Sequence, residues 1–393
     1  MTLDGKTVAI TGGGIGGTAA ALACAQRGAE THLFERADAL LEVGAGLQLS
    51  PNGMKVLDAL GLGARIRSVA SRPRAIELRD HRHERLLMQV PLGDAYERRH
   101  GAPYLHIHRA DLLDVLVEGA RAAGVHVHLG RESSGYTPDP TLDFETGTRF
   151  PADVVIGADG VHSALRRQSW SGHTPSFTGQ VAWRGLVPAD AVPEGLVPAA
   201  TTLLMGPGRH LVLYPLRGGA LINFVAVEER EGWAEEGWSI PDDPANLRVA
   251  FADWGPTARA VLGACEETFL WGLFVHPPLD RWSDGRMVLM GDAAHPMLPF
   301  IAQGAVMALE DAWTLASCLD SHDVPDGVAR YESLRRDRAT RVQTTAQGQA
   351  RLYHLDGPLR PIIHLGMRMV GAARPDFGSA RFDWLHGHDV TVD

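Results

Sequence analysis

The stretch that decides the fold is VAITGGGIGG, residues 8–17. A short strand-forming run leads into the glycines, and the small apolar residues 18–25 that follow are typical of a buried helix. Gly12, Gly14 and Gly17 fit the pattern G-x-G-x-x-G. In this pattern the first glycine allows a tight turn, the second lets the backbone approach a pyrophosphate, and the third lets helix and strand pack closely. The stretch therefore predicts a strand–turn–helix unit that binds a dinucleotide at the positive end of its helix.

The next predicted strand, residues 31–34, ends at Glu35, roughly 20 residues after the glycines. An acidic side chain at this distance accepts hydrogen bonds from ribose hydroxyls, and it disfavours the additional phosphate of NADP. The motif alone does not separate FAD from NAD. A glycine-rich turn without a ligand is the structural alternative, and the β-α-β frame with its terminal acid makes that alternative the weaker one.

Composition and charge exclude several classes of protein. The 37 Lys and Arg against 47 Asp and Glu give a net charge of −10, and the sequence has no basic run that would favour a nucleic-acid partner. No apolar run reaches the length of a membrane span, and the first strand begins too early to leave room for a signal peptide. Cys24, Cys265 and Cys318 are expected to be buried thiols in a reducing compartment. We expect a cytoplasmic protein with neither a membrane nor a nucleic-acid partner.

The chain alternates between two kinds of pattern. Helix-like and strand-like runs alternate first, and the apolar run 153–157 is typical of a strand buried in a parallel sheet. Strands then follow one another almost without helices between about 177 and 275, before the strand 286–290 and the helix 304–319 restore the first pattern. The predicted fold class is α/β, with a discontinuous Rossmann-like domain, an antiparallel β-sheet domain for the substrate, and a C-terminal helical segment. Their expected bounds are 1–72, 100–174 and 278–330 for the first, 73–99 and 175–277 for the second, and 331–393 for the third.

Two further stretches follow buried strands and carry acidic residues. The stretch GADGVHSALR, residues 157–166, places Asp159 in a tight turn. The stretch GDAAHP, residues 291–296, places Asp292 at the carboxyl end of another strand, where open α/β sheets bind ligands. An aspartate that only closes a turn would explain either stretch alone.

Together the three stretches resemble the fingerprints of the single-component FAD-dependent aromatic hydroxylases of the para-hydroxybenzoate hydroxylase type. They occur in the order typical of that family, and the resemblance extends over most of the chain. It implies that the glycine motif holds the ADP part of FAD and that Glu35 binds its ribose. It also implies that Arg109 lies near the FAD phosphate and ribityl region, that Asp159 serves both FAD and NAD(P)H binding, and that Asp292 binds the ribityl hydroxyls.

The resemblance further implies that the backbone at residues 304–306 faces the isoalloxazine ring from a helix N-terminus. Reduced flavin carries negative charge, which the positive end of a helix stabilises. Many relatives have a polar residue where this chain has Val306, so only the backbone role is carried over. The expected cofactor-binding residues are Gly12, Gly14, Ile15, Gly16, Gly17, Glu35, Arg36, Gln48, Arg109, Leu129, Asp159, Gly291, Asp292, Pro299, Gly304, Ala305 and Val306.

The sequence holds one dinucleotide fingerprint, which by resemblance belongs to FAD, so NADH or NADPH is expected as a transient co-substrate. The reaction implied is that of the family: NAD(P)H reduces the flavin, O2 adds to form a flavin hydroperoxide, and one oxygen is transferred to an electron-rich ring in water-excluding surroundings. The expected substrate is a small aromatic or heteroaromatic acid, a phenol or hydroxypyridine, as met in aromatic compound catabolism. The alternatives are an FAD-binding protein without hydroxylase activity and another flavin oxidoreductase.

The predicted catalytic residues are His210 and Tyr214, which share one face of an extended strand. Their strand looks like the substrate-contacting strand of 3-hydroxybenzoate 6-hydroxylase and 6-hydroxynicotinate 3-monooxygenase, and salicylate hydroxylase is similar overall. Those first two enzymes have a polar residue just after the GDAAHP stretch, whereas this chain has Pro299 and Phe300. Either His210 acts without that helper or the substrate differs. Arg184 and Arg217 are interpreted as partners of a substrate carboxylate or, equally, as members of structural salt bridges.

Three smaller expectations complete the prediction. Four His-x-His pairs invite a metal site, but no cysteine or carboxylate completes a ligand set at the usual spacing, so no metal is predicted. The basic stretches 335–341 and 360–374 are interpreted as a solvated or domain-bridging face. A homodimer is expected from relatives alone.

Overall fold

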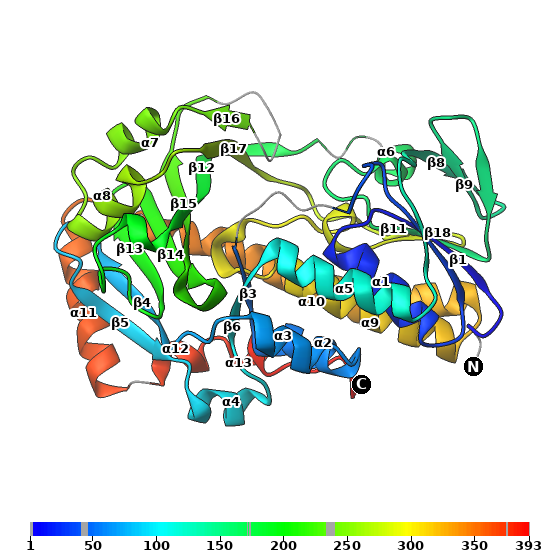
Figure 1. Cartoon of the computed structure of the whole chain (residues 1–393), viewed down its shortest axis with the longest axis horizontal. Helices are drawn as coiled ribbons and strands as arrows, with labels where there is room; N and C mark the ends of the chain where they lie inside the picture. The colour runs from blue at the N-terminus through cyan, green and yellow to red at the C-terminus, as the bar shows by residue number, and fades with distance from the viewer. Residues whose placement is uncertain are drawn as a thin grey trace.

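The computed structural model describes residues 3–40, 46–170, 172, 174–232, 240–374 and 376–392. Figure 1 shows two units side by side, a six-stranded sheet on the right and an eight-stranded sheet on the left, with long helices running between them. The mixed α/β class predicted from the sequence is confirmed. In the described part of the chain, no helix is long and apolar enough to cross a membrane.

The six-stranded sheet has the order β18-β19-β11-β1-β2-β7. All neighbours from β19 to β7 pair in parallel, and β18 adds an antiparallel edge. The parallel strands therefore end at a common edge, and their central residues are apolar because helices cover the sheet. The strands are β1 (Thr7–Thr11), β2 (Glu30–Phe34), β7 (His126–His128), β11 (Val154–Gly157), β18 (Ser283–Asp284) and β19 (Met287–Leu289).

The helices of this unit pack closely because their contact residues are small. A Cβ atom on Gly16 would lie 3.0 Å from the Cβ atom of Ala308, so the glycine lets α1 and α9 approach each other. The helix α10 packs along α9, and it runs without a break across the boundary expected between residues 330 and 331. The bounds are α1 (Ile15–Ala25), α2 (Pro51–Ala59), α3 (Gly63–Val69), α5 (Arg109–Ala122), α6 (Ala164–Ser169), α9 (Gly304–Ser321) and α10 (Val324–Tyr353).

The eight-stranded sheet has the order β16-β17-β12-β15-β14-β13-β4-β5 and gathers strands from two separate parts of the chain. One face buries Trp183, Leu211 and Phe224 beneath α7 and α8. Side chains alternate along a strand, so the neighbouring residues form an inner face that packs against residues 298–301 and α10. The strands are β4 (Ala75–Asp80), β5 (Leu86–Pro91), β12 (Ser176–Pro188), β13 (Thr201–Gly206), β14 (Arg209–Leu216), β15 (Leu221–Glu229), β16 (Ile240–Asp242) and β17 (Thr268–Val275), and the helices are α7 (Pro244–Ala250) and α8 (Pro256–Gly263).

Smaller elements connect and cover these two units. The strands β3 and β6 pair beside the inner face, and β8, β9 and β10 form a separate three-stranded sheet. The helix α11 packs on β5, and α12 follows it onto the same strand. The bounds are β3 (Gly46–Leu49), β6 (Leu105–His108), β8 (Ser133–Thr137), β9 (Thr141–Phe144), β10 (Arg149–Pro151), α4 (Asp94–His100), α11 (Leu359–Ala373), α12 (Phe377–Ala380) and α13 (Asp383–His386), with 3-10 turns at Ala189–Ala191, Arg217–Gly219, Gly291–Ala293 and Pro299–Ile301.

Candidate active site

The register of the six-stranded sheet aligns the ends of its parallel strands. Thr11 of β1 lies opposite both Gly157 of β11 and Phe34 of β2, and Gly157 lies opposite Leu289 of β19. The residues that follow these four ends are therefore neighbours along one edge. This brings together the glycine turn, Glu35 and the two aspartate-bearing stretches, as open parallel sheets do at their ligand sites.

The turn between β1 and α1 leaves no room for side chains. Gly12 has a φ of +105°, and a Cβ atom on it would lie 2.3 Å from the carbonyl oxygen of Ala158. A Cβ atom on Gly17 would lie 2.0 Å from the carbonyl oxygen of Gly12. Among the described residues, the first turn of α1 contains no acidic residue and Gly14 supplies no side-chain cap, so the N–H groups there suit a pyrophosphate. Ile15 and Gly16 continue this turn into the helix.

Glu35 fixes the geometry of the neighbouring loop as well as offering a ribose contact. Its Oε2 atom accepts a hydrogen bond of 2.7 Å from the N–H of Gly13, and its Oε1 atom accepts one of 2.9 Å from the N–H of Ala37. The carboxylate therefore stands beside the phosphate turn in a defined orientation. Arg36 and Leu129 lie on the exposed rim, after β2 and β7 respectively.

Asp159 gives the clearest indication of a polar ligand at this edge of the sheet. Its Oδ2 atom accepts a hydrogen bond of 2.8 Å from the N–H of Ala164, whereas its Oδ1 atom is buried with no hydrogen-bond partner in the described structure. Burial raises the pKa of this carboxyl above its ordinary value. An unsatisfied buried acceptor costs about 1–3 kcal/mol. A hydroxyl-rich ligand such as FAD would satisfy it, so the residues present fit the expected cofactor.

Asp292 follows β19 and faces several positive groups. Burial raises the pKa of its carboxyl, and the charges of His295, Arg109 and Arg166 oppose that rise. The Nη1 atom of Arg166 donates to the carbonyl oxygens of Asp292 and Ala293, at 3.3 and 3.2 Å. This arginine, which ends the GADGVHSALR stretch, thus ties the second motif to the third.

The N-terminus of α9 faces the same region. Gly304 and Ala305 are partly exposed, and Gln303 makes no side-chain cap at this helix end. Val306 is fully buried, and a Cβ atom on Gly53 would lie 3.0 Å from its Cγ2 atom, so its side chain packs against α2. Two other expected cofactor residues lie in flanking segments: Pro299 is exposed, and Gln48 of β3 accepts a hydrogen bond of 2.7 Å from Tyr104.

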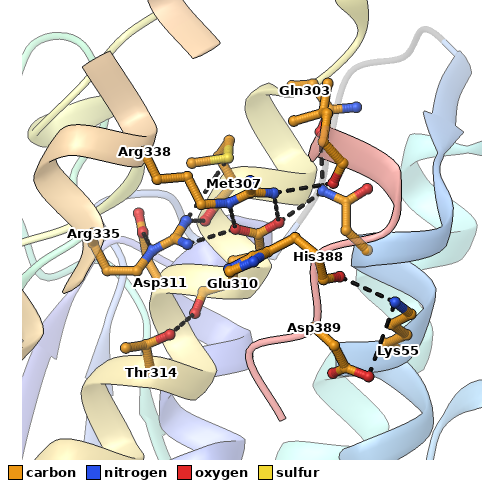
Figure 2. Close-up of polar contacts among 12 residues, drawn as sticks. Lys55, Gln303, Met307, Glu310, Asp311, Thr314, Arg335, Arg338, His388 and Asp389 are labelled. Carbon is orange, nitrogen blue, oxygen red and sulfur yellow. Dashed lines mark hydrogen bonds and ion pairs between the residues drawn. The ribbon is translucent and has the colours of Figure 1, made fainter. Parts of the chain in front are cut away.

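A buried charge network lies beneath these loops, and Figure 2 shows it. Arg335 of α10 bonds Glu310 at 2.5 Å and Asp311 at 2.8 Å, and all three side chains are at most 1% exposed. Arg338 adds bonds of 2.8 Å from its Nε and Nη2 atoms to the Glu310 carboxylate. Of the two interpretations of residues 335–341, a solvated face is wrong for Arg335, because two buried carboxylates of α9 hold it inside. In the sequence, this could have been recognised from two adjacent acidic residues within the apolar helix sequence MALEDAW, because buried carboxylates require a positive partner.

The network positions two segments, the loop that follows β19 and the residues just before α9. Asp311 accepts the backbone N–H of Gly291 at 3.0 Å and pairs with Nε2 of His295 at 2.5 Å. Glu310 accepts a hydrogen bond of 2.7 Å from Asn52, which also donates to Gln303 at 3.1 Å, just before α9. Burial alone would raise the pKa of Asp311, but His295 and Arg335 hold it below its ordinary value. Both loops are therefore fixed by charged groups that themselves need no ligand.

His210 and Tyr214 both lie on the inner face of the eight-stranded sheet. The intervening residues Leu211 and Leu213 point into the opposite core. The His210 ring packs edge-on against Phe300, with 5.3 Å between centroids, and the Tyr214 ring lies 4.6 Å from that of His106. Burial lowers the pKa of His210 well below its ordinary value and raises that of Tyr214, so both side chains are neutral at pH 7.

The two candidate carboxylate-binding arginines differ in their surroundings. Arg184 is buried, with its guanidinium carbon 5.2 Å from the ring centroid of Trp271 on the neighbouring strand β17. Arg217 is half exposed and forms a bidentate salt bridge of 2.6 and 3.0 Å with Asp111. The salt-bridge interpretation therefore holds for Arg217, and Arg184 stays a candidate substrate contact.

One part of the metal prediction needs correction. Glu30, His32 and His126 have potential ligand atoms within 4.8 Å of one another, and His32 also contacts His128 at 3.0 Å. A carboxylate does therefore join one of the four His-x-His pairs, because parallel pairing sets His32 opposite His126. The sequence spacing hid Glu30, which lies almost a hundred positions from that pair. This cluster lies away from the carboxyl edge of the sheet, at the strand ends opposite to Glu35.

Comparisons with known proteins agree with this geometry. A family model described as FAD binding domain matches residues 6–346. The chain belongs to this family. Over 98% of its length it is 39% identical to 3-amino-4-hydroxybenzoate 2-monooxygenase of Streptomyces platensis, covering 96% of that protein. It is 34% identical to 3-hydroxybenzoate 6-hydroxylase of Polaromonas naphthalenivorans, with coverage of 98% and 96%.

Two solved structures match almost the whole chain. A salicylate hydroxylase substrate complex gives a TM-score of 0.82 at 28% identity, covering 99% of this chain and 97% of that one. A Klebsiella pneumoniae protein complexed with FAD and uric acid gives 0.83 at 27% identity, with 95% of each chain covered. The chain is an FAD-dependent aromatic monooxygenase, for which NAD(P)H is the typical reductant.

Proposed function

We propose that this enzyme hydroxylates a small aromatic acid that carries a ring hydroxyl group, bound between the inner face of the eight-stranded sheet and the carboxyl edge of the six-stranded sheet. The observation that carries this proposal is the position of His210. It is a neutral, buried imidazole on the inner face, and it packs on Phe300 in the segment that follows the GDAAHP stretch. A proton acceptor is thus close to the expected flavin edge.

The roles of the surrounding residues follow from their chemistry. When bound, FAD takes electrons from NAD(P)H and activates O2. The turn of residues 12–17 would hold its pyrophosphate, Glu35 its ribose, and Asp159 and Asp292 its hydroxyl groups. The N–H groups at the start of α9 would face the negative charge of the reduced ring.

On the substrate side, three side chains of the inner face have distinct roles in the proposal. His210 accepts the proton of the ring hydroxyl, which makes the ring electron-rich. Arg184 binds the carboxylate, because a guanidinium suits a planar carboxylate. Tyr214 orients the substrate ring, and the apolar rings of Trp271 and Phe300 exclude water.

The names of the relatives favour a hydroxybenzoate over a hydroxypyridine acid as substrate. Two of them act on benzoates, one of which carries an additional amino group. Another relative, at 35% identity over the whole chain, is 6-hydroxynicotinate 3-monooxygenase of Bordetella bronchiseptica.

A substrate panel tests the proposal. Holoenzyme with NADH or NADPH is mixed with 3-amino-4-hydroxybenzoate, 3-hydroxybenzoate, 4-hydroxybenzoate, salicylate and 6-hydroxynicotinate, and both NAD(P)H oxidation and hydroxylated product are measured. We expect product from at least one benzoate, a loss of about 100-fold or more in His210→Ala, and a smaller loss in Tyr214→Phe. Absence of product from every compound would refute the proposal and favour an FAD-binding protein without hydroxylase activity.

We also infer a cytoplasmic homodimer. Cys24, Cys265 and Cys318 are free and buried, which suits a reducing compartment. The helix α11 leaves Leu359 and Ile362 exposed, together with other apolar side chains on one helix, as interfaces between subunits do. Light scattering of the purified holoenzyme is expected to give twice the monomer mass of 42.4 kDa, and a monomer would refute the inference.

A further inference from the structure

His210 has a polar partner that comes from the far end of the chain. Just after the GDAAHP stretch the chain has Pro299 and Phe300, and Phe300 only packs against the imidazole. Instead His354, which caps the C-terminus of α10, places its Nε2 atom 2.6 Å from Nδ1 of His210. The two rings lie 4.9 Å apart between centroids. His210 thus has a polar partner from another element.

A second hydrogen bond continues this contact to the surface. The Nδ1 atom of His354 lies 2.8 Å from Oε1 of Glu229, the last residue of β15. The side chain of His354 is 2% exposed, whereas that of Glu229 is 54% exposed. His210, His354 and Glu229 therefore form an unbroken path of hydrogen bonds from the buried inner face to water.

The carboxylate at the exposed end of this path fixes which nitrogen atom of each imidazole carries a proton. An ionised carboxylate only accepts hydrogen bonds, so His354 carries its proton on Nδ1 and presents Nε2 as an acceptor. His210 must then donate from Nδ1, which leaves a lone pair on its Nε2 atom. Burial lowers the pKa of both imidazoles, so both are neutral at pH 7. This is the protonation state that a buried proton acceptor requires.

Other groups around the path do not change this assignment. Tyr353 packs on His210 with 5.2 Å between ring centroids, and burial raises its pKa to about 12, so it stays protonated. The side-chain amide of Gln180 on β12 lies 3.5 Å from Nδ1 of His354, farther than the Glu229 carboxylate. Phe300 adds only an apolar edge.

We propose that His354 and Glu229 are the second and third members of a proton relay that carries the ring-hydroxyl proton of the substrate from His210 to water. This relay rests on the proposed function of His210. The O–H bond of the substrate breaks as an N–H bond forms at Nε2 of His210. The Nδ1 proton of His210 passes to Nε2 of His354, whose Nδ1 proton passes to Glu229 and on to water. No electrons are transferred. Protonation of the product oxygen along the reverse path restores the original tautomer of both imidazoles.

The test uses three variants of the holoenzyme with the best substrate of the panel. Glu229→Gln keeps an acceptor for His354 but does not take up a proton at neutral pH, and His354→Gln interrupts the path. Both are expected to lower kcat at pH 7 by about 10- to 100-fold, with KM changed less than about twofold. Raising the pH is expected to restore kcat, because the substrate then arrives with its hydroxyl ionised. Glu228→Gln is the matched control, since Glu228 is the preceding residue on β15 and bonds Arg230 at 3.1 Å.

The outcomes separate the relay from the function it serves. If wild-type enzyme hydroxylates no compound of the panel, the proposed function fails and the relay fails with it. If wild type is active and both variants match it, the relay alone is refuted. A loss of kcat that stays equal at every pH would also refute it, because that indicates a structural role. Bound FAD absorbance verifies folding, and the exposed position of Glu229 makes its variant informative should His354→Gln not fold.

Discussion

The two surfaces that meet at the active site are built by different means. The carboxyl edge of the six-stranded sheet presents mainly backbone groups, in the turn of residues 12–17 and at the N-terminus of α9. The inner face of the eight-stranded sheet presents side chains, among them Arg184, His210 and Tyr214. Backbone N–H groups recognise a phosphate whatever the sequence around them, whereas side chains select among similar rings. Cofactor affinity and substrate choice are therefore expected to change separately in variants.

The two surfaces also differ in how charge is arranged behind them. Behind the cofactor loops, the buried carboxylates of Glu310 and Asp311 are paired with Arg335 and Arg338, almost without access to water. Behind the substrate face, His354 connects to the exposed Glu229. The first arrangement fixes a shape, and the second provides an exit for a proton. Variants of the first should change stability and FAD retention, while variants of the second should change turnover.

The largest expected effect comes from Gly17→Ala on the cofactor side. The new Cβ atom would lie 2.0 Å from a backbone oxygen, which is not able to move away as a flexible side chain would. We expect purified protein to retain no FAD, as measured by its visible absorbance after gel filtration. Gly348→Ala is the control, because no atom lies within 4 Å of the added Cβ. FAD affinity within tenfold of wild type in Gly17→Ala would contradict this expectation.

The next effect tests the buried charges. Arg335→Met leaves two carboxylates without their main partner, and removal of one member of a buried ion pair costs about 3–5 kcal/mol. Urea unfolding should show that loss in the free energy of unfolding. Arg336→Met, the matched control, removes an exposed arginine paired with Glu332 at 3.1 Å and should cost less than about 1 kcal/mol. Equal losses in the two variants would be evidence against the network as a source of stability.

On the substrate side, Arg184→Met should weaken binding of acids only. A lost charged hydrogen bond to a carboxylate is worth about 1.5–3 kcal/mol, which raises KM roughly 10- to 100-fold. The KM of a phenol that lacks the carboxylate should stay within about threefold of wild type. Arg217→Met is the control, because Arg217 is half exposed and forms a surface salt bridge with Asp111. The role of Arg184 would be refuted if acid and phenol lost affinity equally.

The smallest expected effect is in the pH dependence of stability. The folded-state pKa of Asp311 lies below its ordinary value of 3.8, so its contribution is present above pH 3.8 and is lost as the pH falls through the lower folded value. In Arg335→Met, Asp311 keeps His295 but loses one of the two groups that lower its pKa, so its folded-state pKa rises relative to wild type. The difference in the free energy of unfolding between the two proteins should therefore narrow as the pH falls through the folded-state pKa of the variant toward that of wild type, by at most about 1.4 kcal/mol per pH unit for each carboxyl. A difference that stays constant as the pH falls through the ordinary value of 3.8 and below would contradict this.

Local sequence signals were sufficient to predict the fold of the unit with the six-stranded sheet. Gly12, Gly17 and Glu35 act through fixed spacing along a strand–turn–helix unit, and the apolar run 153–157 is indeed a strand of the parallel sheet. The switch to successive strands likewise predicted the second sheet. These features depend on neighbours in the sequence, which is why periodicity and turn chemistry find them.

Contacts between distant segments were not predictable in the same way. His354 reaches His210 across more than a hundred residues, and Glu30 reaches His126 through strand pairing. Arg335 appeared in a basic, mostly polar helix, and only the packing of α10 on α9 buries it. In each case one partner looks like an ordinary surface residue until the tertiary arrangement sets it beside the other.

The course of α10 has a consequence for how this enzyme is made. One helix supplies Arg335 to the buried carboxylates of Glu310 and Asp311 and ends at His354 beside His210, although all three fingerprint stretches precede it. A chain that terminates early, before α10, would still be counted as a flavoprotein by any motif search. In such a chain Glu310 and Asp311 would lack Arg335, and His210 would lack its partner His354. The ribosome must therefore synthesise α10 before either arrangement can form.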